Sequence, residues 1–369
     1  MTWQEEFKNS ITTAAQLCER LHLPASEQAR YERIISKYPM LITPYYFSLI
    51  DPADPQDPIA RMCIPSEAEL SAEGDFDTSG EGSNTKQEGV QHKYTQTALI
   101  LSTNVCAMYC RHCFRKRLVG LSDEELNKQV DDAAMYVQAH PEITNVFISG
   151  GDALLNPNSI IERYLGELCR IPHLDLIRFG SRVPVTFPQR IYEDTELLAI
   201  LEEYAKVKPL YIVTQFNHPR EITPESIRAV QAIQKCGIQV RNQTVLLRDV
   251  NDSPDTLGLL LRKLTQIEVV PYYIFQCRPV TGVKGRFQVP MQRGAKIVDD
   301  AKAMQSGIGK GVRYVMSHPL GKIEILGEPE EGKMLFKFHQ NKYPEDASRI
   351  FTVDISPDTT WLDDALCSA

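Results

Sequence analysis

The chain has 369 residues, of which 43% are hydrophobic and 24% are charged, and its formal net charge is −8 at pH 7. This length suits one large α/β domain with smaller additions, and the negative balance excludes the basic surface of a general nucleic-acid binder. No stretch approaches the roughly 18 apolar residues that span a bilayer. The first residues, MTWQEEFKNS, contain no apolar core of a secretory signal. We therefore expect a cytoplasmic protein that binds neither nucleic acid nor membrane.

The first part of the chain, residues 1–92, combines helices with a long polar segment. Residues 1–50 carry apolar side chains at nearly helical spacing, which predicts a helical N-terminal extension. A proline-rich connector, DPADPQDP, follows at 51–58, where neither a helix nor a central strand can form. Residues 70–91 are poor in apolar side chains and rich in glycine, serine and aspartate, so we expect a surface loop there.

From residue 97 onward, short apolar and β-branched runs alternate with amphipathic segments. This alternation predicts parallel βα units in an α/β fold. Units of about 30 residues favour a partial (β/α)6 TIM-like barrel, although periodicity alone leaves an open doubly wound sheet possible. We place the barrel at residues 93–306 and a small β-rich C-terminal part at 307–369. The predicted strands are 97–103, 145–149, 176–180, 210–215, 238–246 and 269–276, and the predicted helices lie near 122–139, 157–169, 194–206, 223–236, 254–265 and 292–306.

Three of the nine cysteines, Cys106, Cys110 and Cys113, cluster in CAMYCRHC, just after the first barrel strand. In a βα barrel such a loop lies on the catalytic face. A structural zinc site normally has four ligands, and His112 would have to bend back to be the fourth. Three thiolates on a [4Fe–4S] cluster leave one iron open to a small molecule. The spacing therefore favours an open cluster over zinc and over three unrelated core cysteines.

CxxxCxxC in this position resembles the radical S-adenosylmethionine superfamily. The resemblance implies that the open iron binds S-adenosylmethionine and that a reductant supplies one electron to generate a 5′-deoxyadenosyl radical. Tyr109 matches the aromatic residue that is common before the second cysteine. The motif SGGD resembles the GGE-type motif that contacts the methionyl group, although a plain tight turn is the alternative for this motif alone. Its residues are Ser149, Gly150, Gly151 and Asp152.

The resemblance is closer to one family within that superfamily. The motifs CAMYCRHCFRKR, ISGGDALL, FGSRVPVTFPQRI, TQFNHPREIT, NQTVLLRDVND and VVPYYIFQC, in this order, resemble the lysine 2,3-aminomutase family from about residue 50 to 325. In that family, pyridoxal 5′-phosphate holds the substrate as a Schiff base while its α-amino group migrates to the β-carbon. Some members carry a C-terminal cysteine cluster that binds zinc and supports oligomers. This chain has only Cys367 there, which leaves a homo-oligomer open.

The family resemblance also suggests residues for each ligand. Pyridoxal phosphate requires a lysine, and Lys322 in PLGKIEI matches its place, with Lys310 in GIGKG as a rival. Arg115 matches the residue that binds the substrate α-carboxylate, for which a planar guanidinium is well suited. The next residues, Lys116 and Arg117, fit a solvated basic patch. The resemblance further assigns Lys93 to the cofactor phosphate and Ser181, Arg182, His218 and Gln243 to contacts with S-adenosylmethionine.

Two motifs depart from the lysine-specific pattern. Members that act on lysine bind its distal ammonium with two aspartates, but the corresponding motifs here are QCRP and MSHP, which contain Arg278 and Ser317. An ammonium beside Arg278 would be repelled, whereas a carboxylate would be paired. We therefore expect an acidic or neutral polar substrate such as L-glutamate, unless Arg278 pairs with a protein carboxylate. The alternatives are a lysine 2,3-aminomutase, a radical enzyme of this fold with a different reaction, and a non-catalytic iron–sulfur or zinc protein.

Overall fold

The computed structural model describes residues 2–121 and 123–363. Within these residues one sheet contains twelve strands that follow one another in chain order. Its centre is parallel, and each strand there is separated from the next by helical segments, as the alternating sequence pattern predicts. All six predicted barrel strands are confirmed. They are β3 (Thr97–Thr103), β4 (Asn145–Gly150), β5 (Leu176–Gly180), β6 (Leu210–Thr214), β7 (Gln239–Leu246) and β8 (Val270–Gln276).

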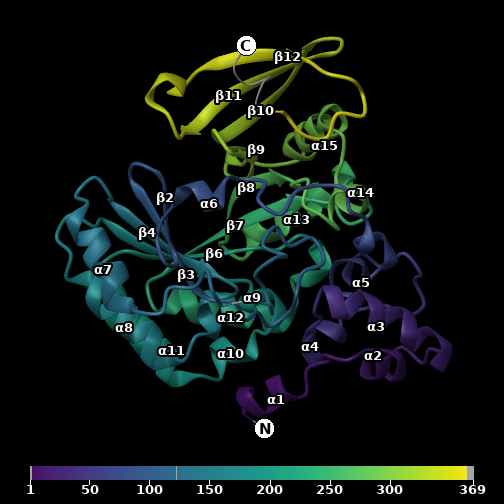
Figure 1. Ribbon diagram of the computed structural model, residues 1–369, viewed down its shortest axis with the longest axis horizontal. Helices are drawn as coiled ribbons and strands as arrows, with labels where there is room; N and C mark the ends of the chain where they lie inside the picture. Colours follow the sequence, from purple (N-terminus) through teal and green to yellow (C-terminus); the bar gives the residue numbers. More distant parts are fainter. Residues whose placement is uncertain (1, 122, 364–369) are drawn as a thin grey trace.

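Six long helices lie outside this parallel sheet and bury their apolar faces against it (Figure 1). Local sequence defines several of their first turns: Thr223 and Ser253 cap two helices that each begin with proline. The predicted helix near 122–139 begins only at Val130, because the backbone N–H of Asn127 bonds to the carbonyl of Leu101 on β3 instead. The helices are α7 (Val130–Ala139), α8 (Asn158–Cys169), α11 (Thr195–Ala205), α12 (Pro224–Lys235), α13 (Pro254–Gln266) and α15 (Met291–Ala303).

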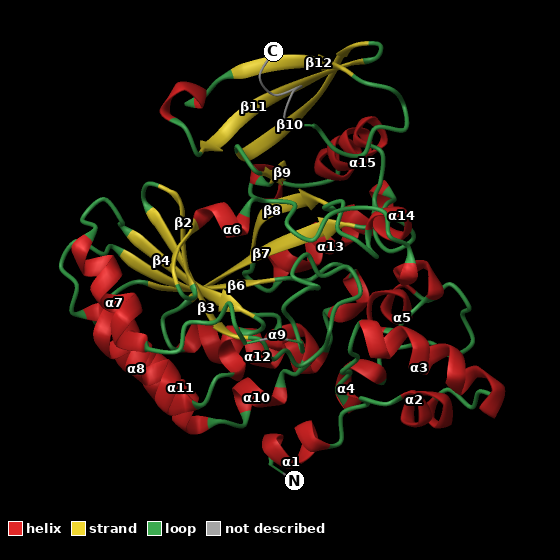
Figure 2. Ribbon diagram, in the orientation of Figure 1, coloured by secondary structure: helices red, strands yellow, loops and turns green. Residues whose placement is uncertain are grey.

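The C-terminal strands continue the barrel sheet instead of forming a separate sheet. The strand β9 (Arg313–His318) pairs in parallel with β8, so it adds a seventh parallel strand. Three antiparallel strands follow, and Figure 2 shows them at the top of the molecule: β10 (Gly321–Glu330), β11 (Lys333–Asn341) and β12 (Ile350–Asp354). This continuity places β10 beside the barrel interior. Cys367 lies outside the described residues.

The N-terminal extension is helical, as predicted, and it holds the cysteine loop. Ile42 forms an isolated bridge with Met108, and the backbone N–H of Tyr109 donates to the carbonyl of Leu41 at 2.9 Å. The N–H of Arg111 donates to the carbonyl of Met62, also at 2.9 Å. The loop therefore lies between the barrel and the extension. The helices of the extension are α1 (Trp3–Lys8), α2 (Ala14–Arg20), α3 (Gln28–Lys37), α4 (Pro44–Phe47) and α5 (Pro58–Cys63).

The segment 70–91 is only partly the surface loop that its composition predicts. Residues 71–76 are exposed, but Ser79, Glu81 and Gln91 are buried. The prediction is wrong for this second half because its polar groups pair with cations of the barrel and are thereby removed from water. The 3-10 turn η2 (Glu67–Leu70) ends where the segment begins. The segment then contains α6 (Glu81–Asn84), β1 (Thr85–Gln87) and the start of β2 (Val90–Tyr94). Among all described helices, none is long and apolar enough to cross a bilayer.

Candidate active site

A cavity of about 340 Å³ extends through the barrel interior. Cys106, Cys110 and Cys113 line it beyond the carboxyl end of β3, where barrel enzymes carry their reactive groups. Thr97, at the amino end of the same strand, and Lys322, on β10, also line it. The cavity thus connects the cysteine loop with the C-terminal strands along the length of the barrel.

The cysteine loop presents its three thiols to this cavity with cationic donors behind them. A guanidinium N–H of Arg182 donates to the sulfur of Cys110 at 2.8 Å, and the backbone N–H of Arg115 bonds to the Cys113 sulfur. Such donors stabilise thiolates, although burial raises the pKa of Cys113 to about 11 and that of Cys106 well above its usual value. No three Cys, His, Asp or Glu side chains in the described ranges converge on a single metal ion. A four-iron cluster requires a wider arrangement, since each thiolate binds a different iron, and these thiols fit that group.

The SGGD motif at the end of β4 packs directly against the cysteine loop. Gly150 has a φ of 115°, and a Cβ there would lie 2.3 Å from the carbonyl oxygen of Thr103. A Cβ on Gly151 would lie 2.3 Å from the carbonyl oxygen of Val105. Only glycine permits this approach of two backbones. The motif therefore positions bare main chain next to the thiols, as the contact with a bound ligand would require.

Asp152 completes this motif and connects it to the next strand. Its carboxylate accepts hydrogen bonds of 2.6 Å from the Ser181 hydroxyl and from the backbone N–H of Arg182. Burial raises the pKa of Asp152 to about 6, against the lowering effect of these bonds. Arg182 also forms an ion pair with Glu221. Ser181 and Arg182 thus line the cavity and are themselves held by two carboxylates.

Lys322 lies on β10 opposite Ser317 of β9, and both residues line the cavity. The Lys322 Nζ lies 4.2 Å from the centroid of the Tyr273 ring. Burial, together with the positive charges of Arg178, Lys93 and Arg278, lowers the pKa of Lys322 to about 7. A neutral amine is therefore available near neutral pH, as condensation with an aldehyde requires.

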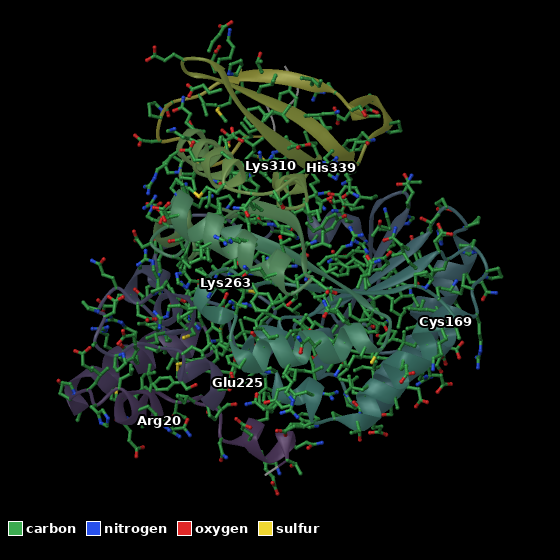
Figure 3. All side chains as sticks on the ribbon, turned by 180° about the vertical axis from the view of Figure 1, so that it is seen from behind. Arg20, Cys169, Glu225, Lys263, Lys310 and His339 are labelled. Atoms are coloured by element: carbon green, nitrogen blue, oxygen red, sulfur yellow. The ribbon has the colours of Figure 1, made fainter. Side chains whose placement is uncertain are left out.

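Lys310, the other lysine that the sequence offered for pyridoxal phosphate, lies away from the cavity. It is exposed in the 3-10 turn η5 (Gly309–Gly311) and does not line the cavity. Figure 3 labels it beside the C-terminal strands. The surroundings of the two lysines therefore favour Lys322 as the residue that would hold pyridoxal phosphate.

Further polar and cationic groups line the same cavity as Lys322. Lys93 on β2 donates to the backbone carbonyls of Ser79 and His318, and burial lowers its pKa to about 7. The hydroxyl of Thr97 donates to the Oδ1 of Asn145, which also accepts from Arg178. Lys93, Thr97 and Arg178 all line the cavity. Arg178 was not expected from the sequence, although a charged residue inside the strand LIRFG is a signal that could have revealed it.

Arg115 lines the cavity and forms a buried ion pair with Glu81 at 2.9 Å. Another of its N–H groups donates to the Ser149 hydroxyl at 3.3 Å. Burial raises the pKa of Glu81, but Arg115, Arg117 and Arg278 outweigh it and hold that pKa at about 2. Arg117 also pairs with Glu81. Arg115 and Arg117 are therefore held by Glu81, which the composition of residues 70–91 had predicted to lie on a surface loop.

Lys116 is not part of a solvated patch, contrary to expectation. It is only 7% exposed and pairs with Glu69, which is fully buried. Glu69 also pairs with Arg111 and Arg286. Burial raises the pKa of Glu69, but Arg111, Lys116 and Arg286 together lower it to about 2. Since Arg111 stands between two of the clustered cysteines, this buried charge cluster fixes the cysteine loop to the end of the N-terminal extension.

Arg278 lies just beyond β8 and lines the cavity. Its Nη1 donates to the Ser79 hydroxyl at 2.7 Å, and its guanidinium lies 4.1 Å from the centroid of the Phe114 ring. Burial lowers the pKa of Arg278 to about 10, against the raising effect of the Glu81 carboxylate, and the positive charge of Arg115 also lowers it. No carboxylate of the described residues forms an ion pair with it. Arg278 thus makes no direct ion pair, but the Glu81 carboxylate lies close enough to interact with its charge.

Of the three remaining residues that the family resemblance suggested, only one lies at the cavity. Gln243 on β7 lines the cavity, whereas Tyr109 and His218 do not. The ring of Tyr109 packs against Gly120, where a Cβ would lie 2.5 Å from it. The Nδ1 of His218 accepts from the backbone N–H of Arg220 at 3.2 Å. His112 lines the cavity instead, with its Nε2 at 3.0 Å from the side-chain nitrogen of Gln215.

Comparisons with known proteins identify the family. Residues 100–260 match the family model for the Radical SAM superfamily. The L-lysine 2,3-aminomutase of Clostridium subterminale is 39% identical over 83% of this chain and 73% of its own length. The L-lysine 2,3-aminomutase of Bacillus subtilis is 36% identical over 89% and 69%. The glutamate 2,3-aminomutase of Clostridioides difficile is 36% identical over 86% and 74%.

These relatives identify the chemistry of the family. Radical SAM proteins use a [4Fe–4S] cluster and S-adenosylmethionine, and lysine 2,3-aminomutases depend on pyridoxal phosphate. The relatives are isomerases that move an amino group within an amino acid. With that level of identity over most of both chains, the protein belongs to the lysine 2,3-aminomutase family of isomerases within the radical S-adenosylmethionine superfamily.

Proposed function

We propose that the protein is a pyridoxal-phosphate-dependent 2,3-aminomutase that moves the α-amino group of an acidic amino acid, L-glutamate, to the β-carbon. One observation carries the choice of substrate: Arg278 lines the cavity with no described carboxylate in ion-pair contact. A guanidinium without a direct ion pair in a partly desolvated site attracts an anion and repels a cation, here with Glu81 offsetting part of its charge.

The charges around the cavity favour the same substrate. Two of the basic groups are offset within the protein, Arg182 by Glu221 and Arg115 by Glu81. Ser317 supplies no charge. The distal ammonium of a lysine substrate would therefore meet no carboxylate in QCRP or in MSHP, the two motifs where lysine-specific members carry aspartates. The lining basic residues are Lys93, Arg115, Arg178, Arg182, Arg278 and Lys322, whereas the lining acidic residues are Glu81 and Asp152.

Each part of the chain has a defined task in this proposal. When bound, the cluster and S-adenosylmethionine supply the hydrogen-abstracting radical, and pyridoxal phosphate carries the migrating nitrogen. The three thiols would bind three irons, and the glycines of SGGD would let main chain contact S-adenosylmethionine. Lys322 would hold pyridoxal phosphate, and Lys93 would bind its phosphate group. Arg115 would orient the substrate through its α-carboxylate, and Arg278 through the distal carboxylate.

Anaerobic turnover tests this function. The protein is reconstituted with iron and sulfide, reduced with dithionite, and supplied with S-adenosylmethionine, pyridoxal phosphate and one L-amino acid at a time. We expect β-glutamate from L-glutamate. A Cys110→Ala variant should form no product, because the cluster would lack one of its three ligands. Cleavage of S-adenosylmethionine with no β-amino acid from any substrate would instead establish a different radical reaction.

A cytoplasmic location and a homo-oligomeric state are also proposals. Fractionation of cells would test the location, and sedimentation of the purified protein would test the oligomeric state.

A further inference from the structure

Phe114, the residue after the third clustered cysteine, contacts both arginines that face the substrate region. The guanidinium carbon of Arg115 lies 4.5 Å from the centroid of the Phe114 ring, and that of Arg278 lies 4.1 Å from it. These arginines come from segments more than 160 residues apart in the chain. One side chain therefore connects the two guanidinium groups.

The ring of Phe114 attracts both guanidinium groups and helps to hold them in place. The negative face of an aromatic ring attracts a guanidinium, and this attraction is larger where water is excluded. Phe114 packs against the hydrophobic core and lines the cavity, so its ring is held from behind. Glu81 binds Arg115, and Ser79 binds Arg278, which restrains the other side of each group.

The shared ring also limits the distance between the two positive charges. Each guanidinium carbon lies within 4.5 Å of one centroid, so the two carbons are at most about twice that distance apart. A guanidinium binds a carboxylate through its N–H donors, and at Arg115 a ligand carboxylate would share the guanidinium with Glu81. Two such groups at a fixed separation match a ligand with two carboxylates, whereas a ligand with one carboxylate can engage only one of them.

We infer that Phe114 is a specificity-determining residue that fixes the spacing of Arg115 and Arg278 for the two carboxylates of a dicarboxylic amino acid. This inference rests on the proposed function, since it assumes that both carboxylates bind in this cavity. A residue without a ring at this position would remove the shared contact and leave only Glu81 and Ser79 to restrain the two guanidinium groups. The protein would then bind dicarboxylic ligands more weakly, and it would no longer distinguish them by the distance between their two carboxylates.

Binding of unreactive ligands tests this role without turnover. Glutarate has two carboxylates and butyrate has one, and titration calorimetry measures the dissociation constant of each for the reconstituted protein. Wild type should bind glutarate more tightly than butyrate. Phe114→Leu keeps an apolar side chain but removes the ring, and it should weaken glutarate binding about tenfold while changing butyrate binding less than about twofold. Phe114→Tyr should behave as wild type.

Controls separate this role from damage to the neighbouring cysteine loop. Iron content after reconstitution should be equal in all three proteins, and Phe76→Leu, at an exposed phenylalanine, should leave both dissociation constants unchanged. If wild type prefers glutarate and Phe114→Leu retains the whole preference, the role of Phe114 is overturned while the proposed substrate stands. If wild type binds glutarate and butyrate equally, the proposed acidic substrate fails, and the inference fails with it.

Discussion

The Nη1 of Arg278 donates a 2.7 Å hydrogen bond to the Oγ of Ser79. A neutral hydroxyl therefore orients this guanidinium, and the part of its positive charge that Glu81 does not offset stays available to a ligand. The residue lies at the position where lysine-specific relatives are expected to carry an aspartate. Under the proposed function, the sign of the charge at this point determines which amino acid fits.

Arg278→Gln should reduce kcat/KM for L-glutamate. Removing one member of a buried, hydrogen-bonded charge pair typically costs about 2–5 kcal/mol, so we expect a loss of at least about 30-fold. Steady-state kinetics under anaerobic conditions measure it. Arg262→Gln, which changes an exposed arginine, serves as the matched control and should retain full activity. Equal activity of Arg278→Gln and wild type would contradict the role of Arg278.

Lys322→Ala should abolish retention of pyridoxal phosphate, because its amine faces the cavity. Visible absorption after gel filtration measures the bound cofactor, and mass spectrometry after borohydride reduction locates the labelled peptide. Lys310→Ala, which removes an exposed lysine, should retain the cofactor. The reverse result for the two variants would show that Lys310 is the attachment site.

Trapping of pyridoxal phosphate at Lys322 should increase with pH and reach its midpoint near pH 7, because a pKa of about 7 makes the amine neutral above that pH. Arg178→Met removes the largest charge contribution that lowers this pKa, after burial itself. The pKa of Lys322 should therefore rise, and the midpoint should move to higher pH. Borohydride trapping across pH 5.5–9 measures both proteins. An unchanged or lower midpoint in Arg178→Met would contradict this electrostatic account.

Glu69→Gln should loosen the cysteine loop, because Arg111, Lys116 and Arg286 would lose their shared carboxylate. Breaking a buried ion pair on one side costs about 3–5 kcal/mol of unfolding free energy, measurable by urea denaturation of the apoprotein. Iron retention against a chelator should also fall. The folded pKa of Glu69, about 2, lies below its ordinary value of 4.5, so its stabilisation is complete above pH 4.5 and is lost as pH falls toward 2.

Glu67→Gln is the control for this variant, because that neighbouring carboxylate is exposed. It should change the unfolding free energy by less than about 0.5 kcal/mol. If Glu69→Gln behaves like Glu67→Gln in both measurements, the buried charge cluster does not position the loop.

The sequence predicted the barrel well because local patterns encode it. Apolar runs at 97–103 and 145–149 lie in strands that the structure confirms, since a strand that is buried on both faces must be apolar. The pairing of β9 with β8, which joins β9 to the barrel sheet, could not be predicted from such local patterns. Its register against Tyr273 and Ile274 of β8 depends on packing between segments about 40 residues apart.

The cysteine loop and Lys322 were also accessible from the sequence, through the spacing of CxxxCxxC and through family motifs. Glu69 and Glu81 were not, because an acidic residue in a polar segment normally indicates a solvated surface. Their burial follows from arginines that approach from distant parts of the chain. Phe114 was missed for a related reason: only the folded chain brings Arg278 to the ring beside Arg115.

A competition assay tests the central claim most directly. Equal concentrations of L-glutamate and L-lysine are supplied together to the reduced, reconstituted protein, and mass spectrometry compares the two β-amino acid products over time. Arg278 at the distal end of the substrate predicts that β-glutamate exceeds β-lysine by at least about tenfold. Formation of β-lysine as fast as β-glutamate, or faster, would contradict the account.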